Sequence, residues 1–152
     1  MAMKIEIISN SPAETMAIGF RLACQFRGGE VIGLCGPLGS GKTHLIKGIV
    51  SGVGTEDETV VNSPTFVIVN EYHGKFDIYH IDAYRLGSVS EFEMLGFDEF
   101  CHPGSIVLVE WADKVRDILE KVAHIEIELS HAGPLKRIMR FKNLPEYVSM
   151  AE

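Results

Sequence analysis

The sequence predicts an α/β fold in which a mixed central sheet is flanked by helices. Three observations lead to this prediction. The apolar run Val31–Cys35 has the length of a buried strand, and a glycine-rich turn and an apolar-periodic helix follow it. Strand-like and helix-like segments alternate along most of the chain. Two pairs of strand-like segments are joined by short turns, at Gly74–Lys75 and at 131–134, which indicates antiparallel additions to a parallel core.

The N-terminal part predicts a strand, Lys4–Ile8, and a helix that begins at Ser11–Glu14. There an N-cap serine, a proline and a reciprocal glutamate stand together. A second apolar stripe on this helix (Ile18, Leu22 and Phe26) fits either burial on two sides or a partner surface. Helical spacing places these residues on its expected core face: Ala13, Met16, Ala17, Phe20, Ala23 and Cys24.

The remaining elements follow the same patterns. The helix after the glycine-rich turn carries an apolar stripe over 45–50 and ends near Gly52 or Gly54. The later expected elements are antiparallel strands Phe66–Tyr72 and Phe76–Ile81, a helix from the capping box Ser88–Glu91 towards Phe100, a buried strand Ser105–Val109, a short helix Asp113–Glu120, and a C-terminal antiparallel hairpin of His124–Leu129 and Lys136–Phe141.

Length and composition limit the class of protein. The 152 residues correspond to one domain, which we expect to span 1–152, and the 46% apolar content is typical of a globular chain. No apolar run is long enough to span a membrane, and the N-terminus lacks a basic segment followed by an apolar one, so the cytoplasm is the expected location. Cys24, Cys35 and Cys101 lack CxxC spacing and are expected to be buried, reduced side chains.

The segment CGPLGSGKTH, 35–44, fits the phosphate-binding pattern G-x-x-x-x-G-K-[ST]. Its glycines allow backbone N–H groups to turn towards phosphate oxygens, and the N-terminus of the following helix adds positive potential. In such a loop Lys42 reaches the β- and γ-phosphates, and the Thr43 hydroxyl coordinates Mg²⁺. The expected nucleotide-binding residues of the loop are Pro37, Leu38, Gly39, Ser40, Gly41, Lys42, Thr43 and His44.

A site of this type also needs an acid at the end of a strand to hold the metal. Asp82 and Glu110 each end an apolar strand, and carboxylates at such ends point into the ligand crevice of an open α/β sheet. We therefore expect Lys42, Asp82 and Glu110 to be catalytic, and Thr43, Asp82 and Glu110 to hold Mg²⁺. The spacing does not decide which acid contacts Mg²⁺ and which orients the attacking water.

Three further positions border these motifs. The segment NSPTF, 62–66, carries a free hydroxyl at Thr65, which suits a γ-phosphate sensor as well as an ordinary turn entering a strand. Arg85 can pair with an acid or meet a phosphate. Trp111, the only tryptophan, follows Glu110 and suits either the core or the nucleotide site. We assign Thr65 and Trp111 to the expected nucleotide site.

The formal net charge of −7 argues against a surface that binds nucleic acid over its whole extent, because phosphate neutralisation needs clustered cations. One basic group stands near the C-terminus, and we interpret it as the solvated face of a strand rather than a binding patch. Its members are Lys136, Arg137, Arg140 and Lys142.

The remaining sequence separates the uses of a phosphate loop. A small-molecule kinase, the main alternative, should carry an arginine-rich lid, yet Arg85 is the only arginine between residues 43 and 115. The guanine-reading motif N-K-x-D of GTP switches and the LSGGQ motif of ABC-type ATPases do not occur. The residues therefore favour an ATPase whose output is a conformational change in a partner.

SPTF (63–66), HIDAYR (80–85) and VEWADKV (109–115), in this order after GPLGSGKT, resemble the TsaE family, and the resemblance runs from about Ser9 to Phe141. It implies a small Mg²⁺-dependent ATPase of tRNA threonylcarbamoyladenosine biosynthesis that acts on the TsaB–TsaD pair, with the tRNA reached through that pair.

By matched motif, the resemblance assigns the phosphate-loop roles to Gly39, Gly41, Lys42 and Thr43, the metal-associated roles to Asp82 and Glu110, a switch-like segment to 63–66, and the tryptophan after the acid to Trp111. Pro37, Ser40 and His44 depart from the residues that the family often carries at these positions.

Overall fold

The computed structural model describes residues 4–37, 39–54, 69–86 and 88–150. The strands are β1 (Lys4–Ser9), β2 (Val31–Cys35), β3 (Val69–His73), β4 (Asp77–Asp82), β5 (Ser105–Glu110), β6 (Ile125–His131) and β7 (Arg137–Lys142). The helices are α1 (Pro12–Ala23), α2 (Lys42–Val53), α3 (Val89–Met94), α4 (Phe97–Phe100) and α5 (Arg116–Leu119), with 3₁₀ turns η2 (Ala83–Arg85) and η3 (Ala112–Val115).

The seven strands form one mixed sheet in the order β1-β7-β6-β2-β5-β4-β3. β2 pairs in parallel with β5 and with β6, and β4 pairs in parallel with β5, so the centre of the sheet is parallel. β3 is added antiparallel at one edge, and β7 and β1 are added antiparallel at the other. The predicted α/β class, the mixed sheet and the C-terminal antiparallel hairpin are confirmed.

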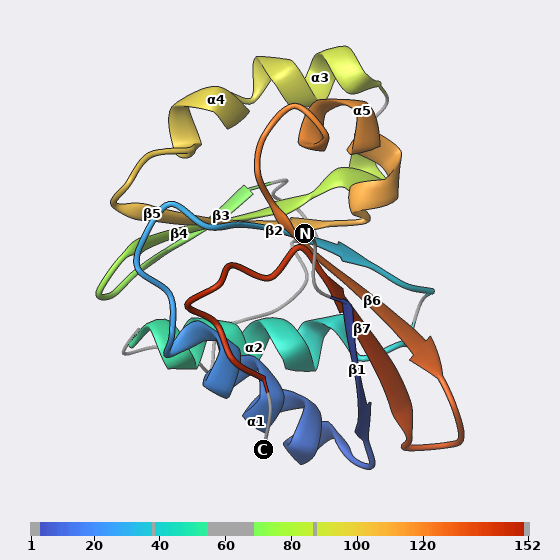
Figure 1. The fold of residues 1–152 in the computed structure, drawn as a ribbon. Coiled ribbons are helices and arrows are strands. Elements are labelled where there is room, and N and C mark those ends of the chain that lie inside the picture. Colours follow the sequence, from blue (N-terminus) through green and yellow to red (C-terminus); the bar gives the residue numbers. More distant parts are fainter. Residues whose placement is uncertain (1–3, 38, 55–68, 87, 151–152) are drawn as a thin grey trace.

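Helices cover both faces of the sheet (Figure 1). α1 and α2 pack on one face over a core that includes Ile32, Leu34 and Ile127, all fully buried. α3, α4 and α5 lie over the other face, where a second core includes Phe92 and Val109. The apolar strands are buried from both sides, which explains why β2 and β5 read as continuous apolar runs.

α1 begins as its sequence predicts. The Ser11 hydroxyl accepts a hydrogen bond from the Glu14 amide at 3.1 Å, and the Glu14 carboxylate accepts one from the Asn10 amide at 2.6 Å. The expected core face of this helix is largely wrong, however. Ala23 is 3% exposed and Met16 is partly buried, but Phe20 is 47% exposed, and Ala13, Ala17 and Cys24 are exposed. The second stripe is the buried one: Ile18, Leu22 and Phe26 are 7%, 0% and 3% exposed.

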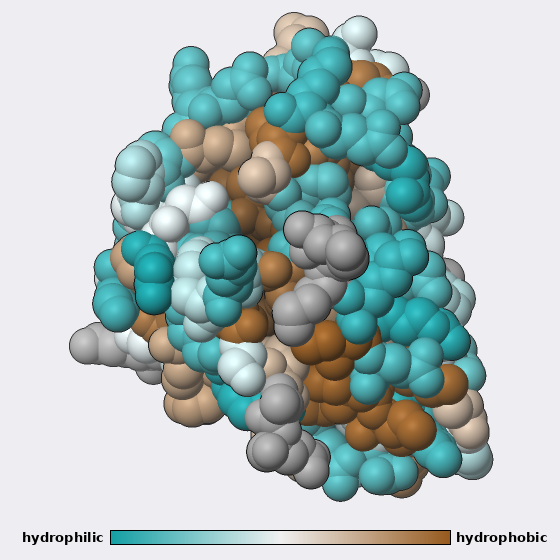
Figure 2. All heavy atoms as spheres, in the orientation of Figure 1, coloured by the Kyte–Doolittle hydropathy of each residue, from teal (hydrophilic) through white to brown (hydrophobic). Residues whose placement is uncertain are grey.

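The reason lies in how α1 meets α2. A Cβ atom on Gly48 would lie 2.1 Å from the Met16 carbonyl oxygen, and one on Gly52 would lie 2.6 Å from the Phe20 carbonyl oxygen. The backbone of α1 at Met16 and Phe20 therefore packs directly against the glycines of α2. On the expected core face of α1, it is the backbone at these positions that contacts α2, and the Phe20 side chain reaches the surface. Figure 2 shows apolar side chains gathered on the surface at the β1 edge of the sheet. Ile8 of β1 is 49% exposed and Phe20 of α1 is 47% exposed.

Three other predicted elements, two helices and one strand, differ from the structure or are only partly described by it. The single helix expected from Ser88 towards Phe100 is two helices, α3 and α4, because Gly96 adopts a left-handed conformation (φ 93°) between them. The helix expected at Asp113–Glu120 is η3 followed by α5. Of the strand expected at Phe66–Tyr72, residues 66–68 lie outside the described residues.

The cysteines are free thiols, but they are not all buried. Cys24 is exposed, and Cys35 and Cys101 are partly buried. Burial raises the pKa of both Cys35 and Cys101, so neither is a ready thiolate. In the described part of the chain, no helix has the length and apolar character needed to cross a membrane.

Candidate functional site

The glycine-rich loop lies between the end of β2 at Cys35 and the start of α2 at Lys42. Gly39 and Gly41 adopt left-handed conformations (φ 74° and 99°), which an L side chain rarely adopts. A Cβ atom on Gly36 would lie 2.7 Å from both the Leu129 carbonyl oxygen and the Ser40 hydroxyl. The glycines therefore permit a loop whose backbone curls at the N-terminus of α2.

Lys42 projects back under this loop. Its ammonium donates hydrogen bonds to the Gly36 carbonyl and, at 3.5 Å, to the Pro37 carbonyl, and it lies 3.4 Å from the centroid of the Trp111 ring. The side chain is buried, and desolvation lowers the pKa of Lys42. The negative charge of Glu110, and to a smaller extent those of Asp113 and Asp82, act in the opposite direction and raise this pKa. The ammonium is thus held at the loop by carbonyl oxygens and an aromatic face, groups that a phosphate oxygen can replace.

The two acids come together through the register of β4 and β5. Asp82 pairs with Glu110 in the parallel ladder, and Leu34 of β2 pairs with Glu110 on its other side. The carboxyl ends of all three strands therefore meet beside the loop. Asp82 is 6% exposed and accepts a hydrogen bond from the Tyr84 amide at 3.0 Å, whereas Glu110 is 2% exposed.

Glu110 has a buried imidazole for a neighbour. Nε2 of His80 lies 3.5 Å from Oε2 of Glu110, and neither ring nitrogen of His80 makes a hydrogen bond among the described residues. His80 belongs to the HIDAYR segment, but no sequence pattern distinguished it from an ordinary buried histidine. Its position next to Glu110 follows from the alternation of side chains along β4 and the pairing of β4 with β5.

Loop, acids and tryptophan line one pocket of about 390 Å³. The predicted site residues on its wall are Gly39, Ser40, Gly41, Lys42, Thr43, His44, Asp82, Glu110 and Trp111. Pro37 does not line the pocket and contributes its carbonyl to Lys42 instead. Leu38 and Thr65 lie outside the described residues, so their assignment stays a prediction.

Five residues of the wall escaped the sequence analysis as site residues: Pro12, Thr15, Tyr84, Leu135 and Arg137. Arg137 was included in a basic group that we interpreted as a solvated strand face. Only the strand order brings the hairpin of β6 and β7 next to β2, and no local pattern records that order.

Trp111 lies on the pocket wall and contacts a second aromatic residue of that wall, Tyr84. It adopts a left-handed backbone conformation (φ 60°), which is uncommon for a bulky residue. Its ring packs against that of Tyr84 with centroids 4.9 Å apart, and Lys114 lies 4.6 Å from the centroid of the Tyr84 ring. Trp111 packs against the second core and also lines the pocket, so it takes part in both of the places that its sequence position allowed.

The donor atoms of the pocket suit a magnesium ion bound together with phosphate. The carboxylates of Asp82 and Glu110 and the hydroxyl of Thr43 are hard oxygen donors, the type that Mg²⁺ prefers. Within the described residues, no group of three or more His, Cys, Asp and Glu side chains could hold a metal by itself. Mg²⁺ in proteins is usually held by one or two carboxylates plus substrate phosphates and water, and these residues fit that arrangement.

The chain is similar to known proteins over most of its length. The family described as "Threonylcarbamoyl adenosine biosynthesis protein TsaE" matches residues 9–139. The tRNA threonylcarbamoyladenosine biosynthesis protein TsaE of Bacillus subtilis is 39% identical over 132 residues, which cover 86% of this chain and 80% of that protein. The protein of the same name from Aquifex aeolicus is 37% identical over 132 residues, 85% of this chain and 90% of that one.

A solved structure shares the fold. The crystal structure of Bacillus subtilis YdiB superposes with a TM-score of 0.76 at 30% identity, covering 97% of this chain and 90% of that chain. The matched region of the sequence contains the loop, both acids and the tryptophan that line the pocket. The chain belongs to the TsaE family.

Proposed function

We propose that this protein binds ATP with Mg²⁺, hydrolyses it, and serves tRNA threonylcarbamoyladenosine biosynthesis by acting on a TsaB–TsaD complex. One observation carries the proposal: Lys42, Asp82 and Glu110, from three different elements, line one pocket beside a phosphate-type loop. The names of the relatives supply the pathway.

In this proposal the residues divide the work. The loop amides and Lys42 bind the β- and γ-phosphates, and bound Mg²⁺ supplies charge neutralisation at the transferred phosphoryl group. Thr43 and one acid hold the metal, while the second acid orients the attacking water. Glu110 is 2% exposed and lines the pocket, so it is suited to act on a single water, because little solvent reaches so buried a carboxylate.

The tRNA is reached through the partner complex in this proposal. The net charge of −7 opposes direct binding of an RNA backbone, and Arg140 of the basic group is engaged by Glu6 and Glu128.

Phosphate release with and without the TsaB–TsaD pair tests the activity. We expect slow release by the isolated protein and faster release, or tighter ATP binding, with the pair. Reconstituted tRNA modification, followed over one turnover and over many, tests the role: the protein should be needed for repeated turnovers. Rapid, partner-independent phosphorylation of a small metabolite would instead establish the kinase alternative.

A further inference from the structure

Arg137 connects the C-terminal hairpin to the phosphate loop. It is the first residue of β7, and one of its terminal nitrogens, Nη2, donates a hydrogen bond to the Gly39 carbonyl at 3.1 Å, across 98 positions of sequence. The other, Nη1, donates to the carbonyls of Gly133, Pro134 and Lys136 at 3.2, 3.4 and 3.0 Å. The guanidinium fork therefore fixes the loop to the turn of its own hairpin.

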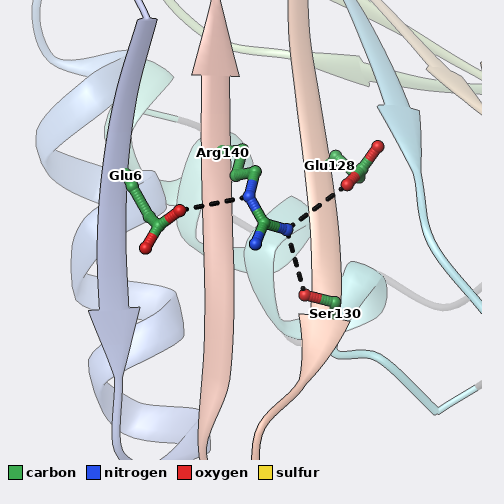
Figure 3. A network of polar contacts seen from close by, with 4 residues as sticks. All are labelled: Glu6, Glu128, Ser130 and Arg140. Atoms are coloured by element: carbon green, nitrogen blue, oxygen red, sulfur yellow. Dashed lines mark hydrogen bonds and ion pairs between the residues drawn. The ribbon is translucent and has the colours of Figure 1, made fainter.

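Arg140 lies three residues further along β7, on the opposite face of the strand, and has a different environment. Its guanidinium bonds the Glu6 carboxylate at 3.1 Å and the Glu128 carboxylate at 3.4 Å, and it donates to the Ser130 hydroxyl (Figure 3). Among the described residues, no carboxylate forms an ion pair with Arg137. The two arginines of the basic group therefore differ: Arg140 is paired with carboxylates, whereas Arg137 lines the pocket and bonds only to carbonyl oxygens among the described residues.

The bond to Gly39 fixes the direction of one peptide unit. In a trans peptide the carbonyl and the following N–H point in opposite directions, so a Gly39 carbonyl held by Arg137 turns the Ser40 N–H away from the hairpin. That N–H lies within the loop, where it donates to the Pro37 carbonyl at 3.2 Å. Because Gly39 has no side chain and a φ of 74°, its peptide has little conformational restraint of its own.

Arg137 also completes the charge distribution around β2. In the strand order β6 lies on one side of β2 and β5 on the other, so the hairpin and the two acids flank the loop from opposite sides. Arg137 and Lys42 line the same pocket as Asp82 and Glu110. The acids suit the metal, and Arg137 adds positive potential on the side of the loop that lies away from them.

We propose that Arg137 is a positioning residue of the phosphate loop, which holds the Gly39 peptide so that the Ser40 N–H stays turned to the inside of the loop, where a phosphate oxygen can replace the Pro37 carbonyl as its acceptor. The ligand class is a linear phosphate oligoanion, with or without a nucleoside. The inference rests on the proposed nucleotide binding and names a residue outside the loop that the binding depends on.

The test compares Arg137→Ala with Arg140→Ala, which removes the same side chain from the same strand, and uses calorimetric titration with Mg²⁺–ATP and with inorganic tripolyphosphate. Thermal midpoints verify that each variant folds. We expect Arg137→Ala to weaken binding of both ligands by about ten-fold, the factor that corresponds to one charge-assisted hydrogen bond at its lower range. Arg140→Ala should change both affinities by less than about two-fold.

The amide resonances of the nucleotide-free protein give a second readout, which does not depend on any ligand. Arg137→Ala should move the Ser40 amide cross-peak, and Arg140→Ala should not. Arg137→Lys keeps the charge but loses the fork, so it should move the Ser40 cross-peak as Arg137→Ala does.

Each contrary result has its own meaning. Equal losses of affinity in Arg137→Ala and Arg140→Ala would mean that Arg137 acts only through the overall charge of the protein. A loss of affinity for ATP but not for tripolyphosphate would mean that Arg137 contacts the nucleoside. Either result overturns the proposal. An unmoved Ser40 cross-peak in Arg137→Ala overturns it as well. If Lys42→Ala binds both ligands normally, the proposed nucleotide site fails instead, and the cross-peak still decides the contact between Arg137 and Gly39.

Discussion

The imidazole Nε2 of His80 lies 3.5 Å from the carboxylate Oε2 of Glu110, and the two side chains are 1% and 2% exposed. This pair stands at the end of the parallel strands, with Asp82 of β4 next to Glu110 in the ladder. A carboxylate placed so deep is costly unless polar neighbours or a cation compensate it. The imidazole of His80 and the ammonium of Lys42 are two such neighbours of Glu110. A bound metal ion would be a third compensating group.

The acids can be tested by neutralising them without changing their shape. Glu110→Gln and Asp82→Asn should each lower Mg²⁺-dependent phosphate release by at least about 10²-fold, as expected when a positioned acid–base or metal-holding group is lost. Folding should persist, because an amide oxygen can still accept the Tyr84 hydrogen bond or lie beside His80. Phosphate release over a range of Mg²⁺ concentrations, with thermal midpoints, checks this. Normal hydrolysis by both variants would contradict the placement of the acids.

Lys42→Ala should weaken binding of Mg²⁺–ATP by about 1.5–3 kcal/mol, the contribution of one charge-assisted hydrogen bond. Calorimetric titration measures the change. Lys47→Ala is the matched control, because Lys47 lies on the same helix and does not line the pocket. Unchanged affinity in Lys42→Ala would remove Lys42 from the site.

Trp111 should report ligand binding through its own fluorescence, because the Lys42 ammonium lies 3.4 Å from its ring centroid. A phosphate chain that draws the ammonium away changes the charge over the indole, so the emission of this single tryptophan should change on titration with Mg²⁺–ATP. In Lys42→Met no cation leaves the ring, and the change should be strongly reduced at saturating ligand. An equal change in both proteins would disconnect the signal from Lys42.

The contact between α1 and α2 should be sensitive to a single methyl group. Gly48→Ala places a Cβ atom 2.1 Å from the Met16 carbonyl oxygen, so the helices must move apart, and we expect a loss of about 1–3 kcal/mol in the free energy of unfolding. Gly104→Ala is the control, because its Cβ would approach nothing closer than the His102 ring at 3.4 Å. Urea unfolding of the two variants measures the difference, and equal stability would contradict the close packing.

Tyr147 should make the stability depend on alkaline pH. Its hydroxyl donates a hydrogen bond to the Glu30 carboxylate, and burial together with this carboxylate raises the Tyr147 pKa from its ordinary 10.0 to about 12. A raised pKa means that the folded state favours the neutral phenol. The stabilisation is therefore complete below about pH 10 and is lost as the pH rises towards 12.

Urea unfolding midpoints of the wild-type protein and of Tyr147→Phe, measured from neutral pH to pH 11, test this dependence. The difference between the two midpoints should shrink above pH 10. A difference that stays constant over the whole range would mean that the hydroxyl does not couple to Glu30.

The local elements could be predicted because short-range chemistry specifies them. The capping box at Ser11–Glu14, the left-handed glycine that ends α2 at Gly54, and the apolar runs of β2 and β5 depend on neighbours within a few residues. The prediction for α1 failed because a distant element decides which of its faces is buried. The buried face of α1 depends on the glycines of α2, and no periodicity within α1 contains that information.

The sequence by itself determined the class of site: the loop with Lys42 and Thr43, and acids at strand ends, follow from residue types in a fixed order. Only the tertiary structure decided that Asp82 and Glu110 stand side by side, that His80 lies beside Glu110, and that Arg137 holds Gly39. The physical reason is that strand order and register are set by the burial of whole sheet faces and by long-range backbone pairing. A short stretch of sequence therefore specifies neither the strand order nor the register.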